Sequence, residues 1–267
     1  MRITTFISRL LAPAVCFSCK ERLPIFYEGI LCPECEKDIK TRSEKECDRC
    51  KNPIAFCHCS KKVLYARNCK RHVKFLNYDP KRRDLNVNRL IYSMKEKSDR
   101  ELYDSLASLM EESLNCAFIS ERVENKLKDA VVTYVPRSRH AIRRTGFDQA
   151  KLFAEAVARK LDIPCIALVK RKKYRARAMK SLHFTERFAN AGSAFVYAQK
   201  EPIPENTLVF VCDDVITTGA SVAAVIDVLK ENGADHFVAV SVGVTSSDDE
   251  TKNNNIKNQN KKGVLNE

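Results

Sequence analysis

The sequence lacks any apolar run that approaches the roughly 18 residues needed for a helix to cross a membrane. Residues 1–15 also lack the long uninterrupted apolar core and the small-residue cleavage site of a signal peptide. Apart from its CxxC pairs, the chain has no internal repeat, which excludes a repeat architecture. We therefore expect a cytoplasmic globular protein, which partners could bring to a membrane.

Acidic residues are too few to balance the basic ones, and the formal net charge is +13 at pH 7. Most of the excess lies between Arg137 and Arg187, where fifteen Lys and Arg residues meet four Asp and Glu residues. Such a density favours a binding surface for phosphates or nucleic acid over a merely solvated face. Rings that interleave with these charges are typical of unspecific single-strand binding. They are His140, Phe147, Tyr174, His183 and Phe184.

Nine of the twelve cysteines fall between Cys16 and Cys69, in a region with little periodic apolar pattern. Disulfides are disfavoured in a reducing compartment, so closely paired cysteines there indicate structural zinc. Eight of the cysteines form four pairs, enough for one or two zinc sites: Cys16 and Cys19, Cys32 and Cys35, Cys47 and Cys50, and Cys57 and Cys59. We prefer the first two pairs as one site. The CxC spacing of the last pair leaves open whether the quartets interleave and whether His58 substitutes as a ligand.

Beyond the cysteine-rich region, helix-like and strand-like apolar patterns alternate. They predict helices at residues 88–97, 101–114, 147–161 and 221–232, and strands at residues 130–135, 163–169, 208–212 and 237–244. This alternation is typical of an α/β fold, a parallel sheet with helices on both faces. We expect a zinc-binding domain at residues 1–62, the α/β domain at residues 63–245 and a disordered tail at residues 246–267.

The most informative segment is VFVCDDVITTGAS at residues 209–221. Its apolar start is a buried strand that delivers Asp213 and Asp214 to the carboxyl end, where open α/β sheets bind ligands. Their carboxylates could accept hydrogen bonds from vicinal ribose hydroxyls and hold the outer shell of a magnesium ion. Free N–H groups and hydroxyls in the following turn could cradle a monoester phosphate. The turn consists of Thr217, Thr218, Gly219, Ala220 and Ser221. Capping alone, the simpler explanation, would account for one Asp and one Thr.

This segment resembles the ligand loop of type I phosphoribosyltransferases, and residues 16–244 as a whole resemble the ComF family. The narrower resemblance rests on the cysteine cluster, on LIYSMK at residues 90–95, on RSRHAIRRTGFDQA at residues 137–150, and on the Glu186, Arg187 and Asn190 motif that precedes Phe195. Thr145 and Asp148 stand where the family motif usually has Arg and Asn.

The ComF resemblance implies a phosphoribosyltransferase-like fold behind a zinc ribbon, in a bacterial protein that helps bring single-stranded DNA into the cytoplasm during natural transformation. It implies phosphoribosyl pyrophosphate with magnesium as a ligand, and single-stranded DNA and other DNA-uptake proteins as partners. It assigns pyrophosphate or another polyanion to a basic set, Arg137, Ser138, Arg139, Arg143 and Arg144.

Two alternatives remain open. One is an active transferase that moves ribose 5-phosphate to an unidentified acceptor, although no residue stands out as its general base. The other is a regulator that uses the fold only to bind partners.

Overall fold

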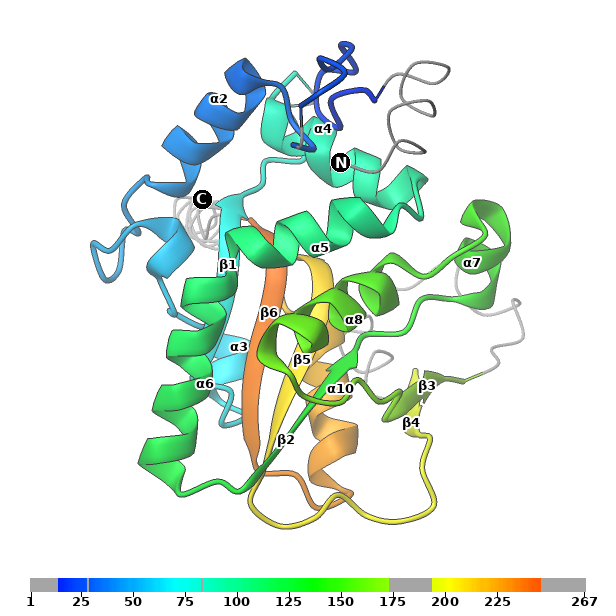
Figure 1. Ribbon diagram of the computed structural model, residues 1–267. Helices are drawn as coiled ribbons and strands as arrows, with labels where there is room; N and C mark the ends of the chain where they lie inside the picture. The colour runs from blue at the N-terminus through cyan, green and yellow to red at the C-terminus, as the bar shows by residue number, and fades with distance from the viewer. Residues whose placement is uncertain (1–13, 28, 83, 173–193, 246–267) are drawn as a thin grey trace, which may run out of the picture.

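The computed structural model describes residues 14–27, 29–82, 84–172 and 194–245. At its centre lies a parallel sheet with the strand order β1-β6-β5-β2 (Figure 1). The strands are β1 (Arg71–Asn77), β2 (Asp129–Tyr134), β5 (Thr207–Ile216) and β6 (His236–Val244). A small antiparallel ribbon pairs β3 (Val169–Arg171) with β4 (Phe195–Tyr197).

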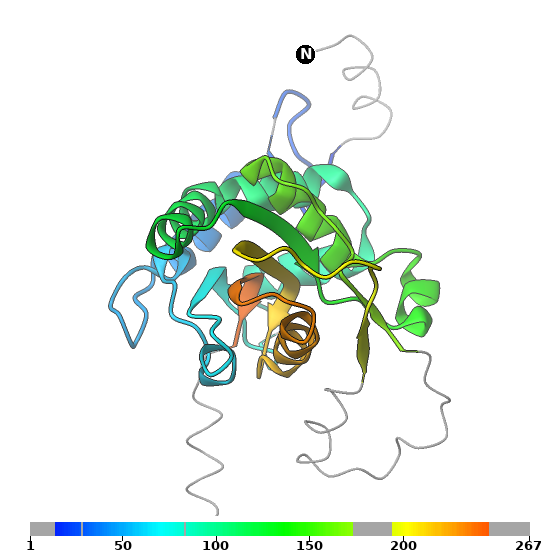
Figure 2. The ribbon, with the colours of Figure 1, turned by 90° about the horizontal axis from the view of Figure 1, so that it is seen from below.

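Helices cover both faces of the parallel sheet (Figures 1 and 2). One face carries α4 (Asn86–Glu96), α5 (Arg100–Leu109), α6 (Glu111–Asn125) and α8 (Gln149–Leu161). The other carries α10 (Ala220–Lys230) and the short α3 (Lys62–Tyr65). Along β5, Phe210 and Cys212 belong to the first apolar core, whereas Val209 and Val211 belong to the second. A strand buried on both faces explains the unbroken apolar run, and the predicted fold class is confirmed.

The cysteine-rich region contains α2 (Pro33–Ser43) and a short 3-10 helix, η1 (Ile54–Phe56). Its first part is not separate from the rest, because Phe17 and Ile39 belong to the same apolar core as α4 and β1. The boundary at residue 62 stays a prediction. Among the described residues, no helix has the length and apolar character that a membrane crossing requires.

Several predicted features lie outside the described residues. These are the tail at residues 246–267, the motif residues Glu186, Arg187 and Asn190, and the rings of Tyr174, His183 and Phe184.

The helix predicted at residues 101–114 is wrong as one element, because the chain bends at Met110 between α5 and α6. The apolar spacing continues across the bend, since Leu106 before it and Leu114 after it are both fully buried in the same core. A periodic pattern records which residues are buried and therefore misses a bend between two helices that share a core.

Two predicted strands are also corrected. The strand at residues 163–169 is reduced to a single bridge between Val132 and Cys165, followed by β3 at Val169. Pro164 has no N–H to donate and gives β2 only its carbonyl, which accepts from the Val132 N–H at 2.9 Å. The strand predicted to end at Cys212 continues to Ile216, because β6 pairs with it over that whole length.

The sequence patterns missed β1 and the short helix α7 (Arg139–Thr145). In β1 the buried residues include His72 and Lys74, so apolar and polar residues do not alternate there in the usual way. In α7 no residue is buried, so the helix has no apolar face for a pattern to reveal.

Candidate functional site

The acid doublet lies inside the last part of β5 and not after its end. Pairing with β2 stops at Cys212, so Asp213 and Asp214 extend beyond that neighbour at the carboxyl edge of the sheet. Asp213 is in register with Ser241 on β6, and residues in register point to the same face of a sheet. The next residue, Asp214, contacts the helices of the opposite face. The doublet therefore meets different neighbours on the two faces.

Asp214 is tied to two side chains from distant parts of the sequence. Its Oδ2 accepts a hydrogen bond from Gln149 Nε2 at 3.0 Å and lies 3.8 Å from Lys95 Nζ. Only 9% of Asp214 is exposed, so these partners hold the carboxylate in a largely desolvated position. The other amide atom of the buried Gln149, Oε1, has no hydrogen-bond partner within the described part of the chain. The residues therefore form a prepared polar site at the start of α8.

Asp213 is half-buried, and its Oδ1 accepts the N–H of Asp214 at 2.9 Å. Burial raises the pKa of Asp213 well above its usual range, and the negative charge of Asp214 raises it further. Two neighbouring acids that resist ionising together are suited to a ligand that brings positive charge, such as a magnesium ion.

The turn after β5, residues 217–221, is called here the phosphoribosyl loop, after the ligand that the sequence predicts for it. Thr217, Thr218 and Ser221 are exposed, and Gly219 is the N-cap residue of α10 with φ of 83°. That conformation is in the left-handed region, which glycine adopts without steric cost. The Ala220 N–H donates to Thr218 Oγ1 at 3.3 Å. Exposed hydroxyls and the first turn of a helix thus lie together, as a site for a phosphate monoester requires.

Arg137 and Ser138 follow β2 at the same edge of the sheet. Asp148, the N-cap of α8, accepts the Arg137 N–H at 3.0 Å, and Arg137 Nη1 donates to Thr145 Oγ1 at 3.1 Å. Thr145 and Asp148, which stand where the family motif usually has Arg and Asn, are therefore the residues that hold Arg137. Ser138 Oγ caps α7 by accepting the Ala141 N–H.

The other predicted basic residues lie on the exposed surface of α7. Arg139, Arg143 and Arg144 are all exposed, and α7 projects from the body of the molecule (Figure 1). Their role as polyanion contacts stays a prediction. The described surface also has a shallow depression near Glu155 and Cys165, toward the other end of α8, which includes none of the predicted site residues.

The eight predicted zinc ligands form two separate groups. Within each group, the sulfur atoms lie within 4.8 Å of one another. The first tetrad is Cys16, Cys19, Cys32 and Cys35, and the second tetrad is Cys47, Cys50, Cys57 and Cys59. His58 belongs to neither, because its Nε2 is bonded to Ser113 Oγ at 2.9 Å. Cys69 is fully buried in the core beside α10.

The donor chemistry of both tetrads fits a metal ion. Burial raises the pKa of Cys16, but N–H groups of Cys32, Cys19 and Ser18 outweigh it and lower the value to about 7. Burial acts on Cys47 in the same sense, and N–H groups of Cys50 and Arg49 likewise lower its pKa to about 7. Each tetrad thus has a thiol that ionises readily, and four converging thiolates suit tetrahedral zinc.

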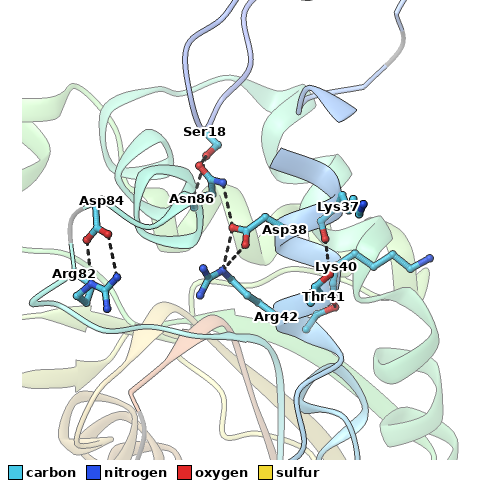
Figure 3. A network of polar contacts seen from close by, with 10 residues as sticks. Ser18, Lys37, Asp38, Lys40, Thr41, Arg42, Arg82, Asp84 and Asn86 are labelled. Atoms are coloured by element: carbon cyan, nitrogen blue, oxygen red, sulfur yellow. Dashed lines mark hydrogen bonds and ion pairs between the residues drawn. The ribbon is translucent and has the colours of Figure 1, made fainter. Parts of the chain in front are cut away.

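The first tetrad lies against α4. Ser18 Oγ donates to the carbonyl of Asn86 at 3.1 Å, Asn86 donates to Asp38 on α2, and Asp38 pairs with Arg42 at 2.9 Å (Figure 3). Lys20 bonds to Ser93, one helical turn before the end of α4. Lys95, the residue that reaches Asp214, belongs to that last turn. The first tetrad therefore supports α4, the helix that carries the basic side chain of Lys95 to the site.

Sequence reasoning missed Lys95 and Gln149 as site residues. Both lie in segments quoted for the family resemblance, Lys95 as the last residue of LIYSMK and Gln149 in the TGFDQA run. The signal was therefore present, but their shared partner Asp214 is 119 and 65 positions away in the sequence (214 − 95 and 214 − 149). Only the fold brings the three together.

Comparison with protein families matches the phosphoribosyl transferase domain to residues 148–262. The chain is 27% identical over 233 residues to DNA utilization protein YhgH of Escherichia coli strain K12, covering 84% of this chain and 94% of that protein. It is 28% identical over 227 residues to Competence protein F of Haemophilus influenzae, covering 83% and 93%. These matches confirm the family resemblance inferred from the sequence.

Among solved structures, adenine phosphoribosyltransferase from Leishmania tarentolae is similar with a TM-score of 0.33 and 13% identity, covering 58% of this chain and 74% of that one. A likeness of this size adds nothing to the family match.

Proposed function

We propose that this ComF family protein, which contains a phosphoribosyl transferase domain, binds phosphoribosyl pyrophosphate with magnesium and handles single-stranded DNA in natural transformation. The observation that carries the ligand proposal is the arrangement of β5 and α10. Asp213 and Asp214 lie at the carboxyl edge of the sheet, just before an exposed hydroxyl-bearing turn capped by Gly219. Acids for the sugar and a helix start for the phosphate are thus adjacent.

Each part of the site has a separate role in this proposal. The phosphoribosyl loop binds the 5-phosphate through N–H groups and hydroxyls, while Asp213 and Asp214 accept hydrogen bonds from the ribose hydroxyls. Arg137 at the end of β2 lies on the pyrophosphate side. Magnesium would supply positive charge to the pyrophosphate, and the acid doublet would hold its water shell. Zinc in the two tetrads would order the cysteine-rich region.

Isothermal titration with phosphoribosyl pyrophosphate and magnesium tests the ligand proposal. We expect binding to the wild-type protein and a loss of at least about tenfold in affinity for Asp213→Asn and for Asp214→Asn, since each replaces a carboxyl oxygen that can accept a hydrogen bond with an amide nitrogen that cannot. Asp129→Asn is the matched control, because Asp129 is exposed at the opposite end of the sheet. Equal heats for wild type and both loop variants would disprove the assignment.

The DNA part of the proposal rests on basic residues of α7 and β3. Lys170, Arg171 and Lys172 are exposed, as are the arginines of α7, and both views place α7 and the ribbon on the same side of the molecule (Figures 1 and 2). Arg171 also lies over the ring of Phe195, at 5.2 Å from its centroid. Phe195 is only 2% exposed and cannot stack on a base, so the support for DNA binding is the group of exposed basic residues.

Fluorescence anisotropy with labelled oligo-dT tests this surface. We expect affinity that falls steeply with salt, because phosphate contacts release counterions. Arg143→Glu with Arg144→Glu should abolish most of the binding. Lys37→Glu with Lys40→Glu makes the same change of charge on the exposed side of α2 and should have little effect. Binding that is absent or insensitive to salt would remove DNA from the proposal.

An active transferase is the second candidate, and the position of Arg137 favours it. A guanidinium held beside the carboxyl edge by Thr145 could stabilise the charge of departing pyrophosphate. Incubation of the protein with phosphoribosyl pyrophosphate, magnesium and single-stranded DNA or a nucleobase, followed by assay of released pyrophosphate, distinguishes transfer from binding alone.

A further inference from the structure

We propose that residues 61–68, called here the strap, position the phosphoribosyl loop, and that metal in the second tetrad strengthens ligand binding through the strap. This inference rests on the proposed function of the loop. The strap begins two residues after Cys59, the last member of the second tetrad, and contains α3. The strap therefore connects the second tetrad to the phosphoribosyl loop.

The start of the strap is fixed by the same groups that surround the tetrad. Lys74 is 5% exposed, and its Nζ donates to the carbonyls of Cys57 at 2.8 Å and Cys59 at 3.0 Å. Arg49, which lies between Cys47 and Cys50 in the other half of the tetrad, donates to the Ser60 carbonyl at 2.8 Å. A metal ion that holds the two halves together therefore also fixes the residue before the strap.

The strap lies directly against the phosphoribosyl loop. A Cβ atom on Gly219 would be 2.9 Å from Val63 Cγ1, closer than such atoms approach, so the loop backbone fits only because this residue is glycine. Lys61 Nζ donates to the Thr245 carbonyl at 3.2 Å. Thr245 in turn donates its hydroxyl to the Thr217 carbonyl at 3.2 Å. The strap thus contacts the loop at its glycine and, through Thr245, at its first residue.

The far end of the strap is anchored to α10 and to the strand that follows it. Arg67 Nε lies 2.7 Å from Asp227 Oδ1 on α10, and Asn68 Nδ2 donates to the Asp235 carbonyl at 2.7 Å. Leu64 between the two ends is fully buried in the core that includes α10. Since the loop is the start of α10, a strap fixed at both ends restricts the loop to one position.

Coupling between the two sites follows from these contacts. Metal that binds only an ordered second tetrad favours the ordered strap and loop, and a ligand that binds only the ordered loop favours the tetrad. Such coupling is reciprocal, and its usual size is about 5- to 150-fold in affinity. We expect about tenfold here, because the strap acts through a few contacts and not through a domain movement.

Variants of Lys61 test the positioning role in the zinc-loaded, full-length protein. By titration, Lys61→Met should weaken binding of phosphoribosyl pyrophosphate with magnesium about tenfold, and Lys61→Arg should restore most of it, since arginine can donate to the same carbonyl. Lys70→Met, an exposed lysine just beyond the strap, is the control. Competition with a zinc chelator should show that phosphoribosyl pyrophosphate with magnesium tightens zinc binding in the wild-type protein but not in Lys61→Met.

Hydrogen exchange at residues 218–222 separates this inference from the proposed function. At a temperature where all variants are folded, exchange should become faster in Lys61→Met and in Cys50→Ser and stay unchanged in Cys19→Ser, the equivalent change in the first tetrad. Unchanged exchange in Cys50→Ser would overturn the inference. Metal-dependent exchange in a protein that fails to bind phosphoribosyl pyrophosphate would uphold the positioning role and reject the ligand.

Discussion

The two cysteine tetrads have the same donor atoms but different surroundings. Cys16, Cys32 and Cys35 of the first tetrad belong to the large apolar core that also contains α4 and β1. The second tetrad has a small apolar cluster of its own, in which Cys47 and Cys57 surround Ile54.

Their attachments to the rest of the chain differ in the same way. The first tetrad supports α4 and, through Lys95, Asp214 on one face of the sheet. The second is attached through polar groups such as Lys74 and His58, and it leads to the loop beside the other face. A shared metal chemistry can therefore serve stability in one place and site geometry in another.

The largest expected effect is the unequal cost of losing a ligand from each tetrad. Cys19→Ser should lower the melting temperature by about 10 °C, since a few kcal/mol correspond to that shift in a chain of this size. Cys50→Ser should lower it much less, because the second tetrad shares little of the main core. Differential scanning calorimetry measures both, and elemental analysis should find that each variant loses one zinc per chain.

The two variants are matched, because Cys19 and Cys50 are each the second cysteine of their tetrad in the sequence and both are partly exposed. Equal losses of melting temperature would mean that both tetrads contribute to one cooperative core. The proposed division between a stabilising and a positioning site would then be wrong.

The next effect concerns the lysine beside each tetrad. Lys74→Met leaves the carbonyls of Cys57 and Cys59 without this donor in a buried place and should cost about 2–3 kcal/mol of unfolding free energy. Lys20→Met, beside the first tetrad, should cost less than about 1 kcal/mol, since Lys20 is exposed and water can replace it. Denaturant unfolding of zinc-loaded protein measures both. A larger loss for Lys20→Met would reverse the comparison.

Local sequence features predicted the tetrads and the phosphoribosyl loop, because their chemistry lies within a few adjacent residues. CxxC spacing brings two sulfurs together in any fold, and TTGAS directly after an apolar strand needs no distant partner to be recognised. The fold class followed from alternating apolar segments for the same reason.

Contacts between distant segments could not be predicted. Lys95 and Gln149 meet at Asp214 only because α4 and α8 both lie against β5. The contact of Val63 with Gly219 depends on a helix of four residues whose sequence has no periodic signal. The preferred grouping of the first two cysteine pairs is confirmed, whereas the spacing of Cys57 and Cys59 alone did not exclude interleaved tetrads.

A smaller effect is expected from adding a methyl group at Gly219. Gly219→Ala places an L-residue at φ of 83°, which costs about 1–2 kcal/mol, and also forces Val63 aside. Gly146→Ala has the same backbone strain at φ of 82° with no atom within 4 Å of the new Cβ. Denaturant unfolding measures the strain in both variants, and titration with phosphoribosyl pyrophosphate should find the larger loss of affinity in Gly219→Ala.

Adding Val63→Ala to Gly219→Ala should recover part of the lost affinity, because the shorter side chain removes the atom in conflict. If Val63→Ala recovered none of the lost affinity, backbone strain alone would explain the loss. The strap would then have no part in it.

The smallest expected effect concerns Asp213 and its ionisation. Asp214 has Lys95 from the side of the first tetrad, whereas no ion pair involves Asp213 among the described residues. Burial, followed by the charge of Asp214, raises the pKa of Asp213 in the folded protein. Between the ordinary Asp value of about 3.9 and this raised value, the folded chain keeps a proton that the unfolded chain has lost. Stability therefore falls as pH rises through that window.

Asp213→Asn removes the ionisation and should flatten the curve of unfolding free energy above about pH 4, where an ordinary Asp is ionised in the unfolded chain while Asp213 keeps its proton in the folded chain. Denaturant unfolding of wild type, Asp213→Asn and the exposed control Asp129→Asn, each at several pH values, measures the difference. The control should follow the wild-type curve. Parallel curves for all three would mean that water reaches Asp213 in the folded chain as freely as in the unfolded one. In that case Asp213 would not need the charge of a bound cation to ionise in the folded chain.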